Sequence, residues 1–442
     1  MTAILRPHCF SGIVKVPASK SHTIRRLLIA SMTNGVTEIL RPLDCLDTRS
    51  CIAVCRSLGA EITEKEDLWI VKGIDSRPGI NSPVRGIKRC CVGNSGTTLF
   101  LSLAMAALGS EPVTFEGDEQ VRGRSAEPLL EALRLMGASV KSASGGCVPI
   151  TICGPWKGGR VSLSCPTSQY LSAILLAASF SPAETETEID VPLLNERPYI
   201  KMTLSYLDKM EIPYKAAPDF SWFSVPGGNA IKPLMGPVPG DFSSASFPAA
   251  AAAISGGSVT LLGLDPEDTQ GDNAFFSFLE RMGCDVRWER TGEKNREKKD
   301  DTWQLTVSRS GALLGGEFDL NDTPDLLPPM AAVACFARGD TALINAAHAR
   351  LKETDRVAVT AEEFRKLGVK ITERPDGIIV HGGEPRQMNV RTDGHGDHRI
   401  VMALACAALG LAAGSTTAIS GAEAADISYP GFMELAGEAK AQ

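Results

Sequence analysis

The most regular feature of the chain is a set of alanine-rich apolar segments of helical length, each directly preceded by a short polar loop. The loops and segments read SKSHTIR–RLLIASM, GNSGTT–LFLSLAMAAL, PTSQ–YLSAILLAASF, GDFSSAS–FPAAAAAI, NDTPDLLPP–MAAVACFA and GDHR–IVMALACAAL. A helix that is apolar on all sides is typical of a protein core. We therefore expect six buried helices, 70 to 84 residues apart, that begin near Arg26, Thr98, Tyr170, Ser246, Met330 and Ile400.

A second pattern has the same period and predicts an amphipathic helix in each repeat. Each helix ends in Leu or Met, usually followed by Gly and a strand-like run, as in VCRSLGAEIT, ALRLMGASVK, FLERMGCDVR and EFRKLGVKIT. YLDKMEIPYK is a variant without the Gly, and FMELAG is a degenerate sixth copy. Glycine is common directly after a helix because it adopts the left-handed conformation at no steric cost.

Two patterns with one period indicate six repeats of about 74 residues, which together account for the 442 residues of the chain. Each repeat holds strands, an apolar helix and an amphipathic helix. This period exceeds the roughly 20–50 residues of most solenoids, which favours a closed α/β architecture. The alternative is a generic α/β enzyme whose helices happen to be evenly spaced.

Composition narrows the class of protein. Hydrophobic residues make up 43% and charged residues 22%, which is ordinary for a globular protein. No apolar run reaches the roughly 18 residues of a membrane span, and no secretory signal is visible, so we expect a cytoplasmic protein. The net charge of −7 disfavours nucleic acid as a partner. The twelve cysteines lie in apolar contexts, which predicts buried reduced thiols. We expect the charged segment 292–301 to be a solvated hairpin loop.

The polar loops point to anion binding. A loop that leads into a helix presents unpaired N–H groups and the positive end of the helix dipole. Cations lie near several of these loops, namely Lys20, Arg25, Arg122, Arg124, Lys352, Arg356 and Arg399. The sequence DGHGDHR offers Asp393, His395, Asp397 and His398 as metal ligands, but no second ligand cluster is evident, so we expect no metal.

Taken together, the motifs resemble the enolpyruvyl transferase family, and within it the enzymes that act on shikimate 3-phosphate. The matching motifs, in order, are VPASKSHTIR, GNSGTT, GDEQVRGR, TSQYLSAILLAA, ERPYIKMTL, GDFSSAS, NDTPD, KETDR, GDHR and SYPGF. The resemblance implies a two-lobed inside-out α/β barrel of six βαβαββ repeats, three per lobe, with helix N-termini directed toward the cleft between lobes. One lobe would comprise residues 1–19 and 240–442, with Asp325, Lys352, Arg356 and Arg399. The inserted lobe, residues 20–239, would carry Lys20, Arg25, Gly96, Arg124 and Gln169.

The resemblance also implies a reaction. The enolpyruvyl group of phosphoenolpyruvate is transferred to the 5-hydroxyl of shikimate 3-phosphate by addition–elimination through a tetrahedral intermediate, and phosphate is released. The implied contacts to shikimate 3-phosphate are Lys20, Ser21, Arg25, Thr167, Ser168, Gln169, Tyr199, Asp325 and Lys352. Those to phosphoenolpyruvate are Lys20, Gly96, Arg124, Gln169, Arg356 and Arg399. Asp325 would be the base, helped by Lys352, and Glu353 the acid, with Lys20 as a further participant. We expect a monomer that uses no cofactor.

Some positions depart from the family pattern. Phe100 stands where Arg is frequent, Ile427 where some members have Lys, Glu196 where Ser is frequent, and His348 where Asn is common. Glu196 would repel the substrate phosphate if it points inward. One alternative is a UDP-N-acetylglucosamine enolpyruvyl transferase, but the loop GDEQVRGR lacks that relative's reactive cysteine. A second alternative is a catalytically silent homologue that binds anions.

Overall fold

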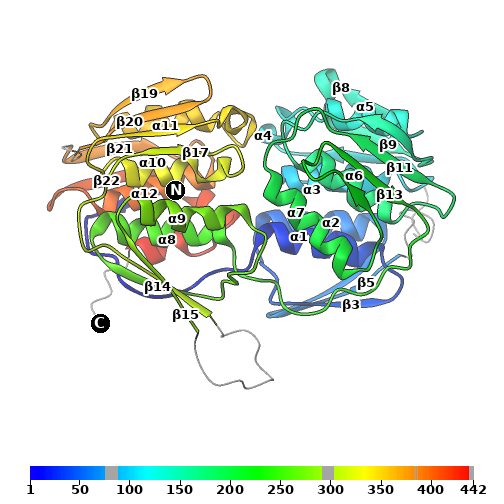
Figure 1. Ribbon diagram of the computed structural model, residues 1–442, viewed down its shortest axis with the longest axis horizontal. Helices are drawn as coiled ribbons and strands as arrows, with labels where there is room; N and C mark the ends of the chain where they lie inside the picture. The colour runs from blue at the N-terminus through cyan, green and yellow to red at the C-terminus, as the bar shows by residue number, and fades with distance from the viewer. Residues whose placement is uncertain (75–87, 291–302, 384, 386, 438–442) are drawn as a thin grey trace. The chain divides into compact units, whose positions relative to one another are not determined.

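The chain divides into two compact units in the computed structural model (Figure 1). Unit 1 comprises Met1–Ser19 and Pro239–Gln442, and unit 2 comprises Lys20–Val238. The structure describes residues 1–74, 88–290, 303–383, 385 and 387–437. The charged segment 292–301 lies outside the described residues, but the strands on either side of it pair as an antiparallel hairpin, as the sequence predicts.

The six apolar helices are confirmed. They are α1 (Lys20–Met32), α3 (Gly96–Ala106), α6 (Gln169–Ser179), α8 (Phe242–Ser255), α10 (Leu327–Ala334) and α12 (His398–Leu409). Their side chains are almost entirely buried. Each begins earlier than predicted, by six residues in α1, which starts at Lys20 rather than Arg26. Some polar residues of these motifs, such as Ser21 and Arg25 in α1, are therefore part of the helix and not of the loop before it.

The amphipathic helices are confirmed as well. They are α2 (Leu46–Leu58), α5 (Glu127–Leu135), α7 (Arg197–Lys209), α9 (Ala274–Arg281), α11 (Arg356–Arg365) and the short α13 (Phe432–Gly437). The glycines after four of them have positive φ, namely Gly59 (118°), Gly137 (102°), Gly283 (94°) and Gly368 (86°). In the variant repeat, Glu211 takes the left-handed conformation instead, with φ 57°. The remaining short helices are α4 (Glu119–Arg122), η1 (Ser144–Gly146), η2 (Gly271–Asn273), η3 (Pro324–Leu326), η4 (Ala347–Leu351) and η5 (Ala422–Ile427).

Unit 2 has three sheets, of which two share one four-stranded topology and the third has three strands. Their strands are β3 (Val36–Leu40), β4 (Glu61–Lys65), β5 (Leu68–Lys72), β6 (Lys88–Cys91), β7 (Val113–Glu116), β8 (Ser139–Ala143), β9 (Cys147–Cys153), β10 (Gly159–Ser162), β11 (Glu186–Asp190), β12 (Lys215–Ala216) and β13 (Trp222–Pro226). The orders are β3-β5-β4, β6-β7-β9-β8 and β10-β11-β13-β12. Strands β6 and β7 are parallel, as are β10 and β11, and an apolar helix connects each pair. In these two sheets the second strand, β7 or β11, also pairs antiparallel with one strand of the hairpin that ends the repeat, β9 or β13.

Unit 1 repeats this topology with help from the N-terminus. Its strands are β1 (Thr2–Leu5), β2 (Gly12–Lys15), β14 (Ser258–Leu262), β15 (Asp285–Arg290), β16 (Trp303–Ser308), β17 (Glu317–Asp319), β18 (Asp340–Ile344), β19 (Lys370–Arg374), β20 (Gly377–His381), β21 (Asn389–Asp393) and β22 (Thr416–Ser420). The orders are β15-β16-β14-β2, β17-β18-β20-β19 and β1-β22-β21. Strand β2 pairs parallel with β14, and β1 pairs antiparallel with β22. The first residues of the chain therefore complete two sheets formed by its last two hundred.

The predicted inside-out α/β architecture is thus confirmed, with apolar helices inside and small sheets outside in each unit (Figure 1). All twelve cysteines are free thiols. Eight are buried as predicted, whereas Cys9 and Cys91 are exposed and Cys147 and Cys153 are partly exposed. Among the described helices, none combines the length and the apolar character that a membrane crossing requires.

Candidate functional site

Arg356, the first residue of α11, is the centre of a buried ionic cluster in unit 1. Its side chain is only 1% exposed. The guanidinium donates to Asp325 Oδ1 at 2.7 Å, to Asp397 Oδ2 at 2.8 Å and to Glu353. Asp397 is fully buried and also caps α12, where its Oδ1 accepts from the Arg399 N–H at 2.9 Å. The charges of these carboxylates outweigh burial and raise the pKa of Arg356 above its usual value.

Asp325 lies in η3, directly before α10, and faces three cations. Arg356 Nη1 is 2.7 Å from Oδ1, Arg399 Nη2 is 2.9 Å from Oδ2, and Lys352 Nζ is 3.9 Å from Oδ1. Burial alone would raise the pKa of Asp325, but the charges of these three residues hold it well below its usual range. Asp325 is therefore a carboxylate.

Asp272 adds a carboxyl group that the sequence analysis missed. It lies in η2, is 1% exposed, and accepts a hydrogen bond from the Ser243 hydroxyl at the start of α8. Burial, reinforced by the negative charge of Asp325, raises the pKa of Asp272 to about 7. Unit 1 therefore holds two carboxyl groups with opposite shifts: the pKa of Asp325 is lowered and the pKa of Asp272 is raised.

Lys20 and Arg25 occupy the first two turns of α1 in unit 2. Lys20 Nζ lies 2.9 Å from Asp47 Oδ2, an ion pair with both side chains largely buried. Arg25 is 1% exposed and donates to Thr203 Oγ1 at 3.2 Å and to Ser172 Oγ at 3.3 Å. Burial lowers the pKa of Arg25 to about 10, so the side chain keeps its charge at neutral pH. Asp47, Ser172 and Thr203 carried no signal in the sequence.

Gly96 and Arg124 lie against each other in unit 2. Gly96 is the first residue of α3, and Ser95 caps this helix by accepting from the Thr98 N–H at 3.3 Å. A Cβ at position 96 would lie 2.4 Å from Arg124 Nη1, closer than real Cβ contacts allow. The absence of a side chain at Gly96 thus leaves room for the Arg124 guanidinium beside the helix start.

The turn before α6 is held by a carboxylate. Glu196 Oε2 accepts from Ser168 Oγ at 2.8 Å, from Ser168 N at 3.0 Å and from Thr167 Oγ1 at 3.1 Å. Glu196 is 1% exposed and directly precedes α7, whose first turn holds Tyr199. The sequence analysis singled out Glu196 as a departure, but it did not foresee these partners.

Three of the six helix starts already have a carboxylate of the protein as their hydrogen-bond partner. The start of α6 already bonds to Glu196. The start of α8 bonds to Asp241, which accepts from Ser244 N at 3.1 Å, and the start of α12 bonds to Asp397. A carboxylate near the positive end of a helix dipole is stabilising, and it takes the place that an external anion would use.

The two positions that lack a family cation carry packed apolar side chains. Phe100 is buried in α3 and meets the ring of Tyr170 edge-on, with centroids 5.1 Å apart. Ile427, at the end of η5, is partly buried against the core of unit 1. His348 in η4 is also buried.

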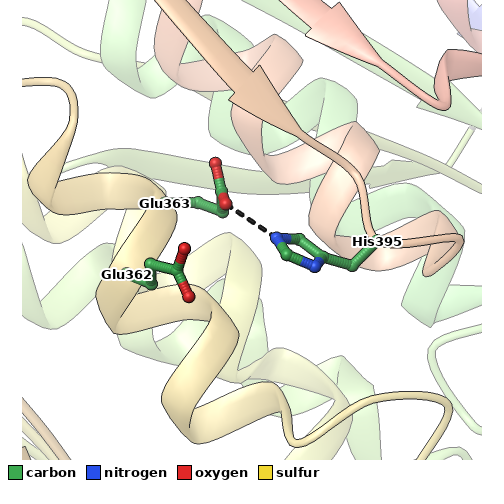
Figure 2. Close-up of side chains that lie close together, drawn as sticks. All are labelled: Glu362, Glu363 and His395. Carbon is green, nitrogen blue, oxygen red and sulfur yellow. Dashed lines mark hydrogen bonds and ion pairs between the residues drawn. The ribbon is translucent and has the colours of Figure 1, made fainter.

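His395, one of the metal candidates of the sequence, lies beside two glutamates of α11 (Figure 2). Its Nε2 is 2.7 Å from Glu363 Oε1, as the dashed line in Figure 2 marks. Glu363 is also bonded to Lys366 Nζ at 2.6 Å and to the Asp393 N–H at 2.9 Å. A lysine inside the cluster supplies the positive charge that a metal would otherwise bring. Of the other candidates, Asp397 belongs to the Arg356 cluster.

Comparison with known proteins gives one consistent family. A sequence model described as EPSP synthase (3-phosphoshikimate 1-carboxyvinyltransferase) matches residues 6–435. A 3-phosphoshikimate 1-carboxyvinyltransferase of Acetivibrio thermocellus is 43% identical over 426 residues, which cover 96% of this chain and 95% of the relative. An enzyme of the same name from Halobacterium salinarum is 39% identical over 442 residues, 98% of each chain.

A solved structure agrees. EPSP synthase from Acinetobacter baumannii superposes with a TM-score of 0.79 at 26% identity, covering 98% of this chain and 97% of that one. A structural similarity of this extent involves both units.

Proposed function

Because the chain belongs to the EPSP synthase (3-phosphoshikimate 1-carboxyvinyltransferase) family, we propose that its buried cations bind phosphoenolpyruvate and shikimate 3-phosphate and that Asp325, Lys352 and Glu353 move the protons. The activity itself, a 3-phosphoshikimate 1-carboxyvinyl transfer in the shikimate pathway, follows from full-length similarity to the named relatives. The same relatives decide against the UDP-N-acetylglucosamine alternative. The residue roles rest on the chemistry that follows.

The observation that carries the proposal is the balance of charge around Asp325. Three carboxylates, Asp325, Glu353 and Asp397, face three cations, Arg356, Arg399 and Lys352. Phosphoenolpyruvate brings a carboxylate and a phosphate, which suit planar guanidinium groups. When these groups take hydrogen bonds from Arg356 and Arg399, Asp325 loses part of the positive field that keeps its pKa low. Its pKa then rises toward a value suited to accept the proton of the 5-hydroxyl.

Glu353 would respond to substrate in the same way as Asp325. Its side chain forms an ion pair with Arg356, and this pair favours the ionised carboxylate. Once substrate anions take over the guanidinium, Glu353 can hold a proton and deliver it to the methylene carbon of the enol. Lys352 supports the negative charge that develops near the hydroxyl oxygen as Asp325 removes its proton. In the second step Glu353 takes a proton back from the new methyl group, the C–O bond to phosphate breaks, and Asp325 passes its proton to the departing phosphate.

In unit 2 the proposal assigns shikimate 3-phosphate to Lys20, Ser21, Arg25, Thr167, Ser168, Gln169 and Tyr199. The charge of Arg25 is buried and fixed by Ser172 and Thr203, so its guanidinium is oriented before the ligand arrives. Arg124 at the start of α3 serves the phosphoenolpyruvate side, together with Lys20, Gly96 and Gln169.

A phosphate-release assay tests the proposed function. We expect release only when phosphoenolpyruvate and shikimate 3-phosphate are both present, and none when UDP-N-acetylglucosamine replaces shikimate 3-phosphate. A silent anion-binding homologue would bind shikimate 3-phosphate in calorimetry but release no phosphate.

Gly96→Ala should raise KM for phosphoenolpyruvate about tenfold, because its Cβ would push Arg124 Nη1 away from the helix start. Losing one charge-assisted hydrogen bond costs about 1.5–3 kcal/mol, which is enough for this change. Inhibition by glyphosate, an anionic mimic of phosphoenolpyruvate in this family, should weaken in parallel. The measurement is an inhibition titration at several phosphoenolpyruvate concentrations.

Gly123→Ala is the matched control, since a Cβ there meets only Gln120 O at an ordinary 3.7 Å. It should keep the KM of the wild type. Equal inhibition of wild type and Gly96→Ala, or inhibition that is not competitive with phosphoenolpyruvate, would count against placing the substrate beside α3.

A further inference from the structure

Glu196 combines three properties that are costly for a glutamate. Its side chain is 1% exposed, it carries a negative charge that interacts with Arg25, and its backbone is left-handed with φ 58°. A buried charge needs hydrogen bonds or an opposite charge to be tolerated. A left-handed backbone at a non-glycine residue persists only where the surroundings enforce it. The contacts of the carboxylate should therefore explain why the residue is held in this way.

These contacts are the hydrogen-bond donors of the turn before α6. One oxygen, Oε2, accepts from Thr167 Oγ1, Ser168 N and Ser168 Oγ, all within 3.1 Å. A hydroxyl has a single proton to donate. While Thr167 and Ser168 donate to Glu196, they cannot donate to a phosphate. The carboxylate thus fills the anion position at the start of α6.

The electrostatics have the same consequence. The proposed function brings the phosphate of shikimate 3-phosphate to Arg25 and to this turn, where the Glu196 carboxylate already accepts three hydrogen bonds. An incoming phosphate dianion meets a fixed negative charge in a buried setting, where repulsion is only weakly screened. To use the turn fully, the substrate must displace the carboxylate or share its donors at a cost.

We propose that Glu196 is a specificity-determining residue that acts as an internal anion, competing with the phosphate of shikimate 3-phosphate for the hydrogen-bond donors of the Thr167–Ser168 turn. The inference rests on the proposed function. It implies that this protein binds shikimate 3-phosphate more weakly than it would if Glu196 did not occupy the donors of Thr167 and Ser168. It also implies that small anions such as inorganic phosphate are kept from this turn, because only a ligand with further contacts can displace the carboxylate.

Calorimetric titration of the full-length wild type and of Glu196→Gln with shikimate 3-phosphate tests this inference. Glutamine keeps the size and an accepting oxygen but removes the charge. We expect the Kd for shikimate 3-phosphate to fall about tenfold, equivalent to about 1.4 kcal/mol. The KM for phosphoenolpyruvate, measured with shikimate 3-phosphate saturating, should change about twofold or less. Inorganic phosphate should compete with shikimate 3-phosphate at lower concentrations in the variant than in the wild type.

Glu211→Gln is the matched control. Glu211 follows the other end of α7, has nearly the same backbone conformation with φ 57°, and pairs on the surface with Lys232. This control should bind shikimate 3-phosphate as the wild type does. Glu196→Ser, which opens the turn completely, serves as the second variant if Glu196→Gln does not fold. Equal or weaker binding by a folded Glu196 variant would overturn the inference. Failure of the wild type to bind shikimate 3-phosphate would instead overturn the proposed function, and the inference with it.

Discussion

Asp325→Ala should reduce kcat by about a thousandfold or more while shikimate 3-phosphate still binds. A positioned base contributes about 10²–10⁴-fold to a rate, and Asp325 is the carboxylate that faces Lys352, Arg356 and Arg399 at once. The proposed site for shikimate 3-phosphate includes several further contacts, so the Kd of this ligand should change by less than about tenfold. Single-turnover kinetics and calorimetry measure the two quantities separately.

The change in affinity for phosphoenolpyruvate distinguishes a role of Asp325 as a base from a role in packing alone. Removing Asp325 takes an internal counter-ion from Arg356 and Arg399. Both guanidinium groups then attract an external anion more strongly, so phosphoenolpyruvate should bind at least as well as it does to the wild type. Asp325→Asn should behave alike with less structural disturbance.

Asp340→Ala serves as the control for an aspartate in the same unit. Its side chain is 65% exposed and pairs with His381 on the surface. Turnover by this control should equal that of the wild type. Turnover near the wild-type rate in Asp325→Ala would remove Asp325 from the mechanism.

The repeat could be predicted from the sequence because its signals are local. Apolar side chains on all faces predict a buried helix, and a glycine after an amphipathic helix marks its end, as at Gly59 and Gly368. The starts of the helices were predicted less accurately, because they depend on contacts that are not local in the sequence. Lys20 and Arg25 look like loop residues in sequence, but partners in distant segments allow them to lie within a largely buried helix.

The partners of the candidate site could not be predicted, because they are far apart along the chain. Asp47 meets Lys20, Glu196 meets Thr167 and Ser168, and Asp397 meets Arg356, 41 residues away. No spacing rule connects such pairs. The motif resemblance identified which cations to consider, and the fold shows which carboxylates neutralise them. That neutralisation bears on the proposed mechanism, since a carboxylate paired with two arginines would accept a proton only after substrate anions had drawn those arginines away.

Arg356→Met should lower the free energy of unfolding at pH 7.5 by about 3–5 kcal/mol. This is the usual cost of leaving buried carboxylates without their cation. Asp397 is fully buried and depends on Arg356 for two hydrogen bonds, at 2.8 and 3.1 Å. Binding of phosphoenolpyruvate should be lost as well. Urea denaturation followed by circular dichroism gives the stability.

The pH dependence of this loss separates charge from packing. Burial opposes ionisation of Asp397, but the charge of Arg356 prevails and lowers its pKa below the ordinary value, as the cations do for Asp325. These ion pairs therefore stabilise the wild type above about pH 4, and their contribution disappears as the pH falls through the lowered values. Without Arg356, burial should raise the pKa of Asp397, so this carboxyl can protonate as the pH falls. The difference between variant and wild type should consequently shrink between pH 7.5 and pH 5.

Arg350→Met is the control, because Arg350 also pairs with two carboxylates, Asp355 at 2.7 Å and Glu373 at 2.9 Å, but is 24% exposed. Solvent weakens such pairs, so this variant should lose only about 1 kcal/mol. A loss in Arg356→Met that is equally small, or one that does not change with pH, would mean that the carboxylates around Arg356 do not need its charge. The charge exchange by which phosphoenolpyruvate activates Asp325 would then lose its physical basis.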